Sequence, residues 1–168
     1  FIGGKMVDNV RDDELLFAPE RCGGIAAEQL VGLCFSGKYD RAGVMKLVRG
    51  RGGLLAHLGT SDAMEVERRM ARGDERARLV YDAMLYTAAK SIGAMAAAAG
   101  GDIDRIILTG GIAHSAYVAD YLTKKVRFIA PVEVMAGEFE MEALAAGAAR
   151  VLSGRETAHR FRDLAKGE

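Results

Sequence analysis

The fold is decided by one stretch of the chain, Arg105-Ile106-Ile107-Leu108-Thr109-Gly110-Gly111-Ile112-Ala113-His114-Ser115. Its β-branched run Ile106–Leu108 is bounded by turn residues and predicts a buried strand. Gly110 and Gly111 have no Cβ, so the backbone can turn sharply there and a ligand can approach closely. Ser115 is a favourable N-cap for a following helix, whose free N–H groups and dipole attract anions. This order suits a nucleotide, although a plain tight connection has the same pattern.

Length and composition indicate one globular domain or one lobe of a larger protein. The chain has 168 residues and is 50% hydrophobic, which is enough for a full-sized core. Lys plus Arg and Asp plus Glu number 23 each, and this balance argues against a general nucleic-acid binder. No apolar run approaches the roughly 18–20 residues that span a bilayer, and there is no signal peptide, so we expect a cytoplasmic protein without a membrane partner. Because the chain opens on Phe1 directly before Ile2-Gly3-Gly4, we also expect a fragment whose N-terminal part is absent.

The two cysteines argue against a metal site of their own. Cys22 and Cys34 have no histidine at ligand spacing, which disfavours zinc. We expect two reduced thiols, the default in the cytosol. The 21 glycines fall in turns without a repeat, which is typical of an α/β chain.

Hydrophobic periodicity and cap residues predict a chain made mostly of helices. Asp62 and Glu65 have the spacing of a capping box, and Gly73 is a natural helix stop before a second cap at Asp74. Helices are expected over Ala26–Phe35, after Asp40, from Asp62 to Arg72, from Asp74 to about Ala99, after Ser115 and over Glu140–Leu152.

Strands are expected near the start of the chain and in its second half. The candidates are Lys5–Asn9, Ile106–Leu108 and one extended segment from Val126 to Met135 around Pro131. The last helix is expected to turn Leu144 and Leu152 inward. The second half thus alternates helix and strand, which predicts an α/β lobe whose two late strands pair in parallel.

Seven segments, in chain order, resemble the carboxylate (acetate/butyrate) kinase family, and its butyrate kinases most closely. They are Val7–Asn9, Phe17–Gly24, Leu58–Asp62, Gly73-Asp74, Leu79–Met84, Leu108–Ala113 and Gly137–Leu144. The resemblance implies the C-terminal, nucleotide-binding lobe of a two-lobed kinase over residues 1–168. The implied fold is actin/hexokinase-like (ribonuclease H-like), with helices around a short mixed sheet.

The resemblance also implies an activity. Such enzymes transfer the γ-phosphoryl group of ATP to butyrate or another short fatty carboxylate, giving an acyl phosphate and ADP, reversibly and with Mg²⁺. It further implies a role in fatty acid metabolism and a homodimer or higher oligomer. The substrate pocket would lie on the absent lobe, so residues 1–168 alone are expected to have no turnover.

The resemblance carries the catalytic role to Arg21. A planar guanidinium can hold phosphate oxygens with two hydrogen bonds, and phosphoryl transfer needs the charge on these oxygens neutralised. The alternative is a surface arginine on a loop. The family usually has serine where Cys22 stands, which leaves the local hydrogen bonding open.

The resemblance assigns nucleotide binding to two segments. Gly110, Gly111 and Ile112 would form the turn on the adenosine side, and Ser115 would cap the helix, touch the nucleotide, or both. Asp62, with Ala63 beside it, would form the second contact, although capping the next helix is a competing role for Asp62.

An acidic residue near Mg²⁺ is implied before the last helix. Glu140 is our first choice and Glu138 the second, because hard cations prefer oxygen ligands. Acids are also favoured at helix N-termini by the dipole alone.

Two rival functions remain open from the sequence. One is a nucleotide-binding regulatory module of the same fold without phosphoryl transfer, and the other is a kinase for acetate or branched carboxylates. A dinucleotide-binding domain is disfavoured because no Gly-x-Gly-x-x-Gly follows a first strand.

Overall fold

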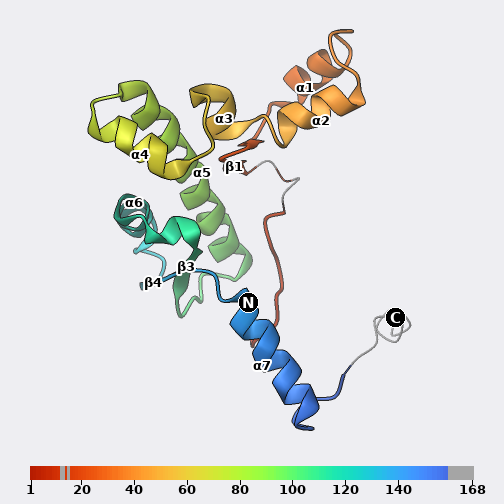
Figure 1. The fold of residues 1–168 in the computed structure, drawn as a ribbon, viewed down its shortest axis with the longest axis vertical. Coiled ribbons are helices and arrows are strands. Elements are labelled where there is room, and N and C mark those ends of the chain that lie inside the picture. Colours follow the sequence, from red (N-terminus) through yellow and green to blue (C-terminus); the bar gives the residue numbers. More distant parts are fainter. Residues whose placement is uncertain (12–13, 15, 159–168) are drawn as a thin grey trace.

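The computed structural model describes residues 1–11, 14 and 16–158. Within these residues the chain forms α-helices, a 3₁₀ helix and two small sheets around one long helix (Figure 1). The helices are α1 (Ala27–Cys34), α2 (Arg41–Val48), α3 (Gly53–Leu58), α4 (Ala63–Ala71), α5 (Glu75–Ala98), η1 (Gly111–His114), α6 (Ala116–Val126) and α7 (Glu140–Leu152). The strands are β1 (Phe17–Ala18), β2 (Arg21–Cys22), β3 (Ile106–Gly110) and β4 (Val132–Ala136).

The core lies where α3, α4 and α6 pack against the N-terminal half of α5. Tyr81 of α5 is fully buried there, and Leu54 and Val66 are fully buried beside it. Val118, Leu122 and Val126 form the buried stripe of α6, as their spacing predicts. Each fully buried large apolar side chain contributes about 1.5–3 kcal/mol, so this cluster contributes strongly to the stability of the fold.

The predicted caps are confirmed. The Asp40 carboxylate accepts from the Gly43 amide at 2.7 Å, and Asp74 accepts from Ala77 at 2.9 Å. Asp62 accepts from the amides of Met64 and Glu65 at 2.9 and 3.3 Å. The capping box is not closed in the usual way, because the Glu65 carboxylate accepts from the Thr60 hydroxyl instead of reaching the Asp62 amide.

The late strands β3 and β4 pair in parallel, as predicted, with Ile106 opposite Val132 and Gly110 opposite Ala136. The expectation that β3 is buried is wrong. Ile107 is 54% exposed, while Leu108 packs against the core. The reason is that successive side chains of a strand point to opposite faces, so Ile107 lies on the open face of the sheet and Leu108 on the covered one.

Two predicted strand segments are wrong in extent. Gly3 and Gly4 do make a turn that brings Ile2 and Lys5 together, but residues 6–9 form no strand. Of the extended segment predicted from Val126 to Met135, only the part from Val132 onward forms a strand, β4, because Val126 is buried as the last residue of α6 and a turn separates it from β4. Burial of the α6 stripe decides this short apolar run in favour of helix.

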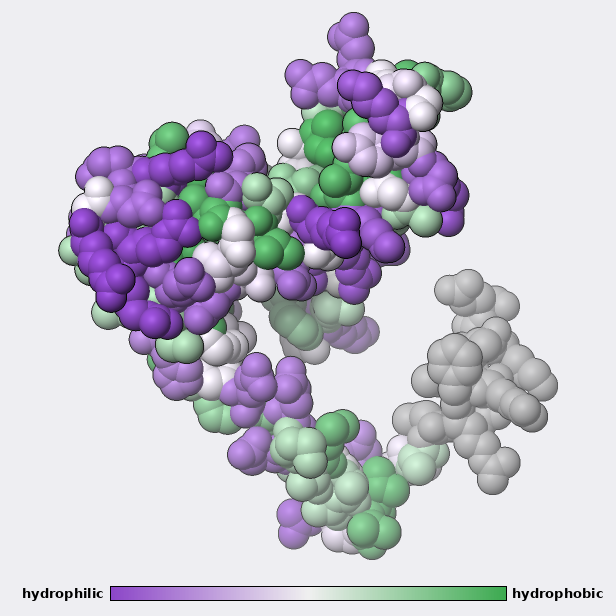
Figure 2. All heavy atoms as spheres, turned by 45° about the horizontal axis from the view of Figure 1, so that its top comes forward, coloured by the Kyte–Doolittle hydropathy of each residue, from purple (hydrophilic) through white to green (hydrophobic). Residues whose placement is uncertain are grey.

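Helix α7 has the predicted bounds but not the predicted packing. None of its residues is buried, and Leu144 and Leu152 are 68% and 88% exposed. Figure 1 shows α7 extending away from the other helices, and Figure 2 shows its apolar side chains on the surface. The inward stripe is therefore an apolar face that no described element covers.

The hairpin of β1 and β2 sits tightly on the start of α3. The Leu55 amide donates to the Pro19 carbonyl at 3.0 Å, and the Gly50 amide donates to the Glu20 carbonyl at 2.8 Å. A Cβ on Gly53, whose φ is +63°, would lie 1.8 Å from the Ala18 carbonyl oxygen. Only glycine fits this contact, which holds β2 in place.

We expect Gly53→Ala to lower the free energy of unfolding by about 3 kcal/mol or more, through a backbone clash and a strained φ. Chemical denaturation measures it. Gly24→Ala is the matched control, because its Cβ would meet nothing within 4 Å, and it should change stability by less than about 0.5 kcal/mol. Equal stability of the two variants would contradict the contact.

Asp74 predicts an acid-sensitive contribution to stability. The Ala77 amide, followed by the Arg69 guanidinium, lowers the pKa of this carboxyl from its ordinary 3.8, and Arg69 lies 2.8 Å away. A lowered folded-state pKa gives stability that is present above the unfolded value and is lost as the pH falls through the folded value. We expect the stability difference between wild type and Asp74→Asn to shrink below about pH 4. Denaturation at pH 7 and pH 3 tests this, and a constant difference would contradict it.

Candidate functional site

The turn after β3 leaves open space in front of its backbone. Gly110 has φ +82°, a left-handed value that favours glycine, and it leads into η1. A Cβ on Gly110 or on Gly111 would meet no atom within 4 Å. Ile112 is 39% exposed and offers an apolar side chain beside this space. The turn thus has the form that close approach of a ligand requires, as the sequence predicts.

The loop before α7 lies directly against this turn. The Gly110 amide donates to the Gly137 carbonyl at 3.0 Å, and the Gly137 amide donates back to the Gly110 carbonyl at 3.2 Å. The structure therefore holds Gly137, one residue before Glu138 and three before Glu140, against the predicted nucleotide turn, and both glutamates are exposed. The carboxyl ends of parallel strands meet at the same edge of a sheet, which explains why segments far apart in sequence join here.

The two glutamates fit Mg²⁺ that arrives with a nucleotide better than a metal held by protein alone. Among residues 1–11, 14 and 16–158, no group of three or more His, Cys, Asp or Glu side chains is placed to hold a metal ion. Mg²⁺ usually keeps several waters and uses one or two carboxylates together with substrate phosphates. Glu140 and Glu138, at the N-terminus of α7, could supply those carboxylates.

The Ser115 hydroxyl makes two hydrogen bonds within the fold, one as acceptor and one as donor. Its hydroxyl oxygen accepts from the Val118 amide at 3.1 Å, which confirms the predicted cap of α6. Its one hydroxyl proton goes to Oε1 of Glu67 at 2.6 Å. In this arrangement the proton is not available to a ligand.

Glu67 is a residue that the sequence reasoning missed. Its Oε1 also accepts from the Tyr81 hydroxyl at 2.8 Å. Burial, and then the hydrogen bond to Glu67, raises the pKa of the Tyr81 phenol, so it remains a neutral donor. The available signal was a carboxylate next to the apolar stripe of α4, formed by Val66 and Met70.

Asp62 has its predicted capping role, and its second oxygen lies 3.6 Å from the exposed Arg68 guanidinium. The preceding loop is fixed by Arg69, which donates to the Leu58 carbonyl at 2.9 Å. Asp62 and Ala63 therefore stand at a well-anchored helix start. Contact of either residue with a nucleotide stays a prediction.

Arg21 is half-buried on β2, and its backbone pairs with that of Arg49 in an isolated antiparallel β-bridge. Its strand packs on α2 and α3 and the partner strand packs on α5, whereas the turn at Gly110 packs on β4 and α6. Helix α5 connects the two groups. The structure thus carries Arg21 and the turn on different elements, which are connected through their contacts with α5 and α6.

Cys22, which stands where the family usually has serine, makes a hydrogen bond to the backbone. Its Sγ donates to the Gly23 carbonyl at 3.1 Å, a bond that a serine hydroxyl could also make. Burial raises the pKa of the thiol, which keeps it protonated. Cys22 and Cys34 are both free, in agreement with the expected reduced thiols.

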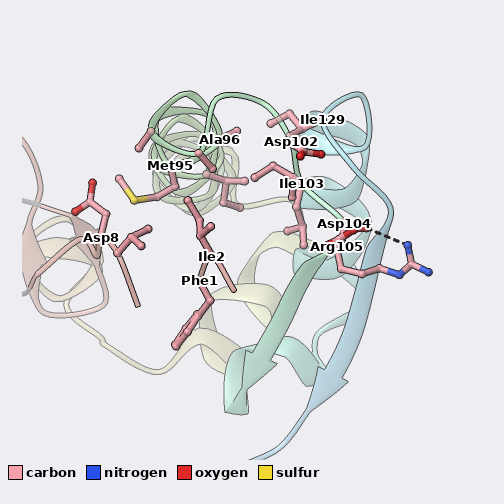
Figure 3. A pocket seen from close by; sticks show the side chains of 15 residues that line it. Phe1, Ile2, Asp8, Met95, Ala96, Asp102, Ile103, Asp104, Arg105 and Ile129 are labelled. Carbon is pink, nitrogen blue, oxygen red and sulfur yellow. Dashed lines mark hydrogen bonds between the residues drawn. The ribbon is translucent and has the colours of Figure 1, made fainter. Parts of the chain in front are cut away.

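A cavity of about 330 Å³ lies at the opposite end of β3, where α5 ends (Figure 3). Ile2, Met95, Ile103 and Ile129 are among the apolar side chains around it, and Asp102 lies at its edge. Ligands of open α/β sheets bind at the carboxyl ends of the strands. This cavity is at the amino end, so we do not assign the nucleotide to it.

No helix in the part of the chain that the structure describes is both long and apolar enough to cross a bilayer.

The chain matches known proteins over most of its length. A model of the acetokinase family (Acetate_kinase) matches residues 16–157. Butyrate kinase 2 of Clostridium acetobutylicum is 47% identical over 161 residues, which are 95% of this chain and 45% of that protein. A probable butyrate kinase of Phocaeicola vulgatus is 47% identical over 153 residues, or 90% of this chain and 43% of that protein. The chain thus spans less than half the length of these relatives.

Solved structures support the fold class. The chain is similar to the acetate kinase of Porphyromonas gingivalis with a TM-score of 0.73 and 24% identity, covering 82% of this chain and 41% of that one. It is similar to the acetate kinase of Entamoeba histolytica with a TM-score of 0.69 and 17% identity, covering 80% and 43%. These neighbours confirm the predicted actin/hexokinase-like α/β fold. The family model matches most of the chain, and this match shows that the chain belongs to the acetokinase family.

Proposed function

We propose that this chain is the nucleotide-binding lobe of a kinase that transfers the γ-phosphoryl group of ATP to butyrate, reversibly and with Mg²⁺. The family membership and the similarity to butyrate kinases support the reaction class. One observation carries the site: the open Gly110-Gly111 turn is hydrogen-bonded to the loop that presents Glu138 and Glu140. A nucleotide on this turn would have its phosphates near two carboxylates able to share a magnesium ion.

In the proposed reaction a carboxylate oxygen of butyrate attacks the γ-phosphorus. The bond between the γ-phosphorus and the bridging oxygen of ADP breaks, and butyryl phosphate and ADP are formed. Mg²⁺, when bound with ATP, neutralises charge on the phosphates. Gly110, Gly111 and Ile112 would receive the adenosine, with Asp62 and Ala63 as the second contact.

Arg21 would stabilise the transferring phosphoryl group. Its guanidinium can place two N–H donors on the equatorial oxygens, where charge is neutralised during transfer. The Gly53 contact below the hairpin keeps its strand fixed, which suits a group that must be positioned before the reaction.

Residues 1–168 alone are proposed to have no turnover, because the butyrate pocket would lie outside this chain. A cytoplasmic homodimer or higher oligomer acting in fatty acid metabolism is part of the same proposal. The test is acyl phosphate formation by a full-length kinase that contains these residues, with butyrate, acetate and isobutyrate compared. ADP binding without acyl phosphate from any of the three would favour a regulatory module instead.

We expect Arg21→Ala, in the full-length kinase, to lower kcat by about 10²–10³-fold while the Kd for ADP changes less than about threefold, because the charge acts mainly in the transition state. Steady-state kinetics and calorimetry measure the two effects. Arg76→Ala is the control, since Arg76 is an exposed arginine on α5. An unchanged kcat in the Arg21 variant would exclude the catalytic role.

We expect Glu140→Gln to raise the Mg²⁺ concentration needed for half-maximal rate by about tenfold, and Glu138→Gln to raise it less, because loss of a carboxylate weakens a hard-cation site. Mg²⁺ titrations at saturating ATP test this. Circular dichroism checks that α7 is kept, since both residues also suit a helix N-terminus. A larger effect of Glu138→Gln would reverse the assignment.

A further inference from the structure

One carboxylate oxygen joins three helices next to the proposed nucleotide site. Oε1 of Glu67 on α4 accepts from the Tyr81 hydroxyl of α5 at 2.8 Å and from the Ser115 hydroxyl at the start of α6 at 2.6 Å. Glu67 and Ser115 are 48 positions apart in the chain. Both bonds have an ionised acceptor, the class of hydrogen bond that is shorter and stronger than a neutral one.

Each end of this link lies a few residues after one of the two segments proposed to hold the nucleotide. Glu67 lies one helical turn after Ala63, about 6 Å along the axis of α4, whose N-cap is Asp62. Ser115 lies directly after η1, which begins at Gly111. The Glu67–Ser115 bond therefore links the helix that begins at the Asp62 segment to the residue that ends the turn after Gly110.

The hydrogen bonds of this link restrict the side-chain conformation of Ser115 and Glu67. Ser115 uses its proton on Glu67 and its oxygen on the Val118 amide, so its rotamer is fixed from both sides. The negative charge on Glu67 is also favoured beside the N-terminus of α6 by the helix dipole. Tyr81 is fully buried, so the third arm anchors the carboxylate to the core.

We propose that Glu67 is a positioning residue that fixes the spacing between the Asp62 segment and the Gly110 turn and thereby sets nucleotide affinity. The inference rests on the proposed nucleotide-binding function. Glu67 acts through Ser115 and does not itself touch the nucleotide. It should affect ATP and ADP while leaving the carboxylate substrate unaffected.

The test is calorimetric titration of ADP into the full-length kinase, combined with KM values for ATP and butyrate. Glu67→Ala is expected to weaken ADP by about tenfold and to raise the KM for ATP similarly, from loss of hydrogen bonds to a charged group. The KM for butyrate should change less than about twofold. Glu67→Gln keeps an oxygen that can accept from both hydroxyls, so it should restore ADP affinity to within about threefold of wild type.

Two further variants separate positioning from general stability. Tyr81→Phe removes only the core arm, so it should lower Tm but leave the Kd for ADP within about twofold. Glu67→Asp keeps the charge but is too short to reach both hydroxyls, and it should weaken ADP even if Glu67→Ala does not fold.

The outcomes are distinct. Unchanged ADP affinity in folded Glu67→Ala or in folded Glu67→Asp, or weakening by Tyr81→Phe equal to that of Glu67→Asp, overturns the positioning role. A wild-type protein that binds no ADP overturns the proposed function itself.

Discussion

Burial of one face of α5 is the constraint on which the rest of the described structure depends. Ala77, Tyr81, Met84 and Leu85 lie on that face, and none is more than 4% exposed. Helices α3, α4 and α6 pack against α5, and so does the hairpin that carries Arg21. Because close-packed interiors transmit displacement, a rotation of α5 would move the hairpin and the nucleotide turn together. The two parts of the proposed site, Arg21 and the Gly110 turn, are therefore kept in relation by packing through α5.

Tyr81 brings a polar group, its phenol hydroxyl, into the buried face of α5. A buried phenol needs a partner for its hydroxyl, and the partner here is a carboxylate that also holds Ser115. The apolar part of Tyr81 thus contributes to the core while its oxygen ties the core to the start of α6. The turn that would receive a nucleotide is anchored at one side by this link and at the other by Gly137.

Local features of the structure could be predicted from the sequence, and long-range ones mostly could not. The caps at Asp40, Asp74 and Ser115 depend on bonds to an amide three residues ahead, which the sequence displays directly. The exposure of α7 could not be predicted, because periodicity identifies an apolar face but not what covers it. The segment after Val126 failed for a related reason, since short apolar runs suit helix and strand equally until burial decides.

The candidate site divides along the same line. The turn at Gly110 could be predicted because two glycines stand at the end of an apolar strand. Its contact with Gly137 could be predicted because parallel strands end at the same edge of a sheet. The roles of Arg21 and Glu140 came from family resemblance, because an arginine or a glutamate near a turn has no special pattern of its own. The link from Glu67 to Ser115 shows no local pattern, since the two residues are 48 positions apart.

Because α7 is exposed, we expect it to open faster than the helices of the core. A helix of 13 residues is marginal in water unless tertiary packing supports it, and no residue of α7 is buried. Its backbone amides should therefore exchange with solvent deuterium far sooner than those of α5, whose opening requires the core to separate. Hydrogen exchange would then divide the lobe into a slow unit centred on α5 and a fast one at α7, with the Gly110–Gly137 pair at the boundary.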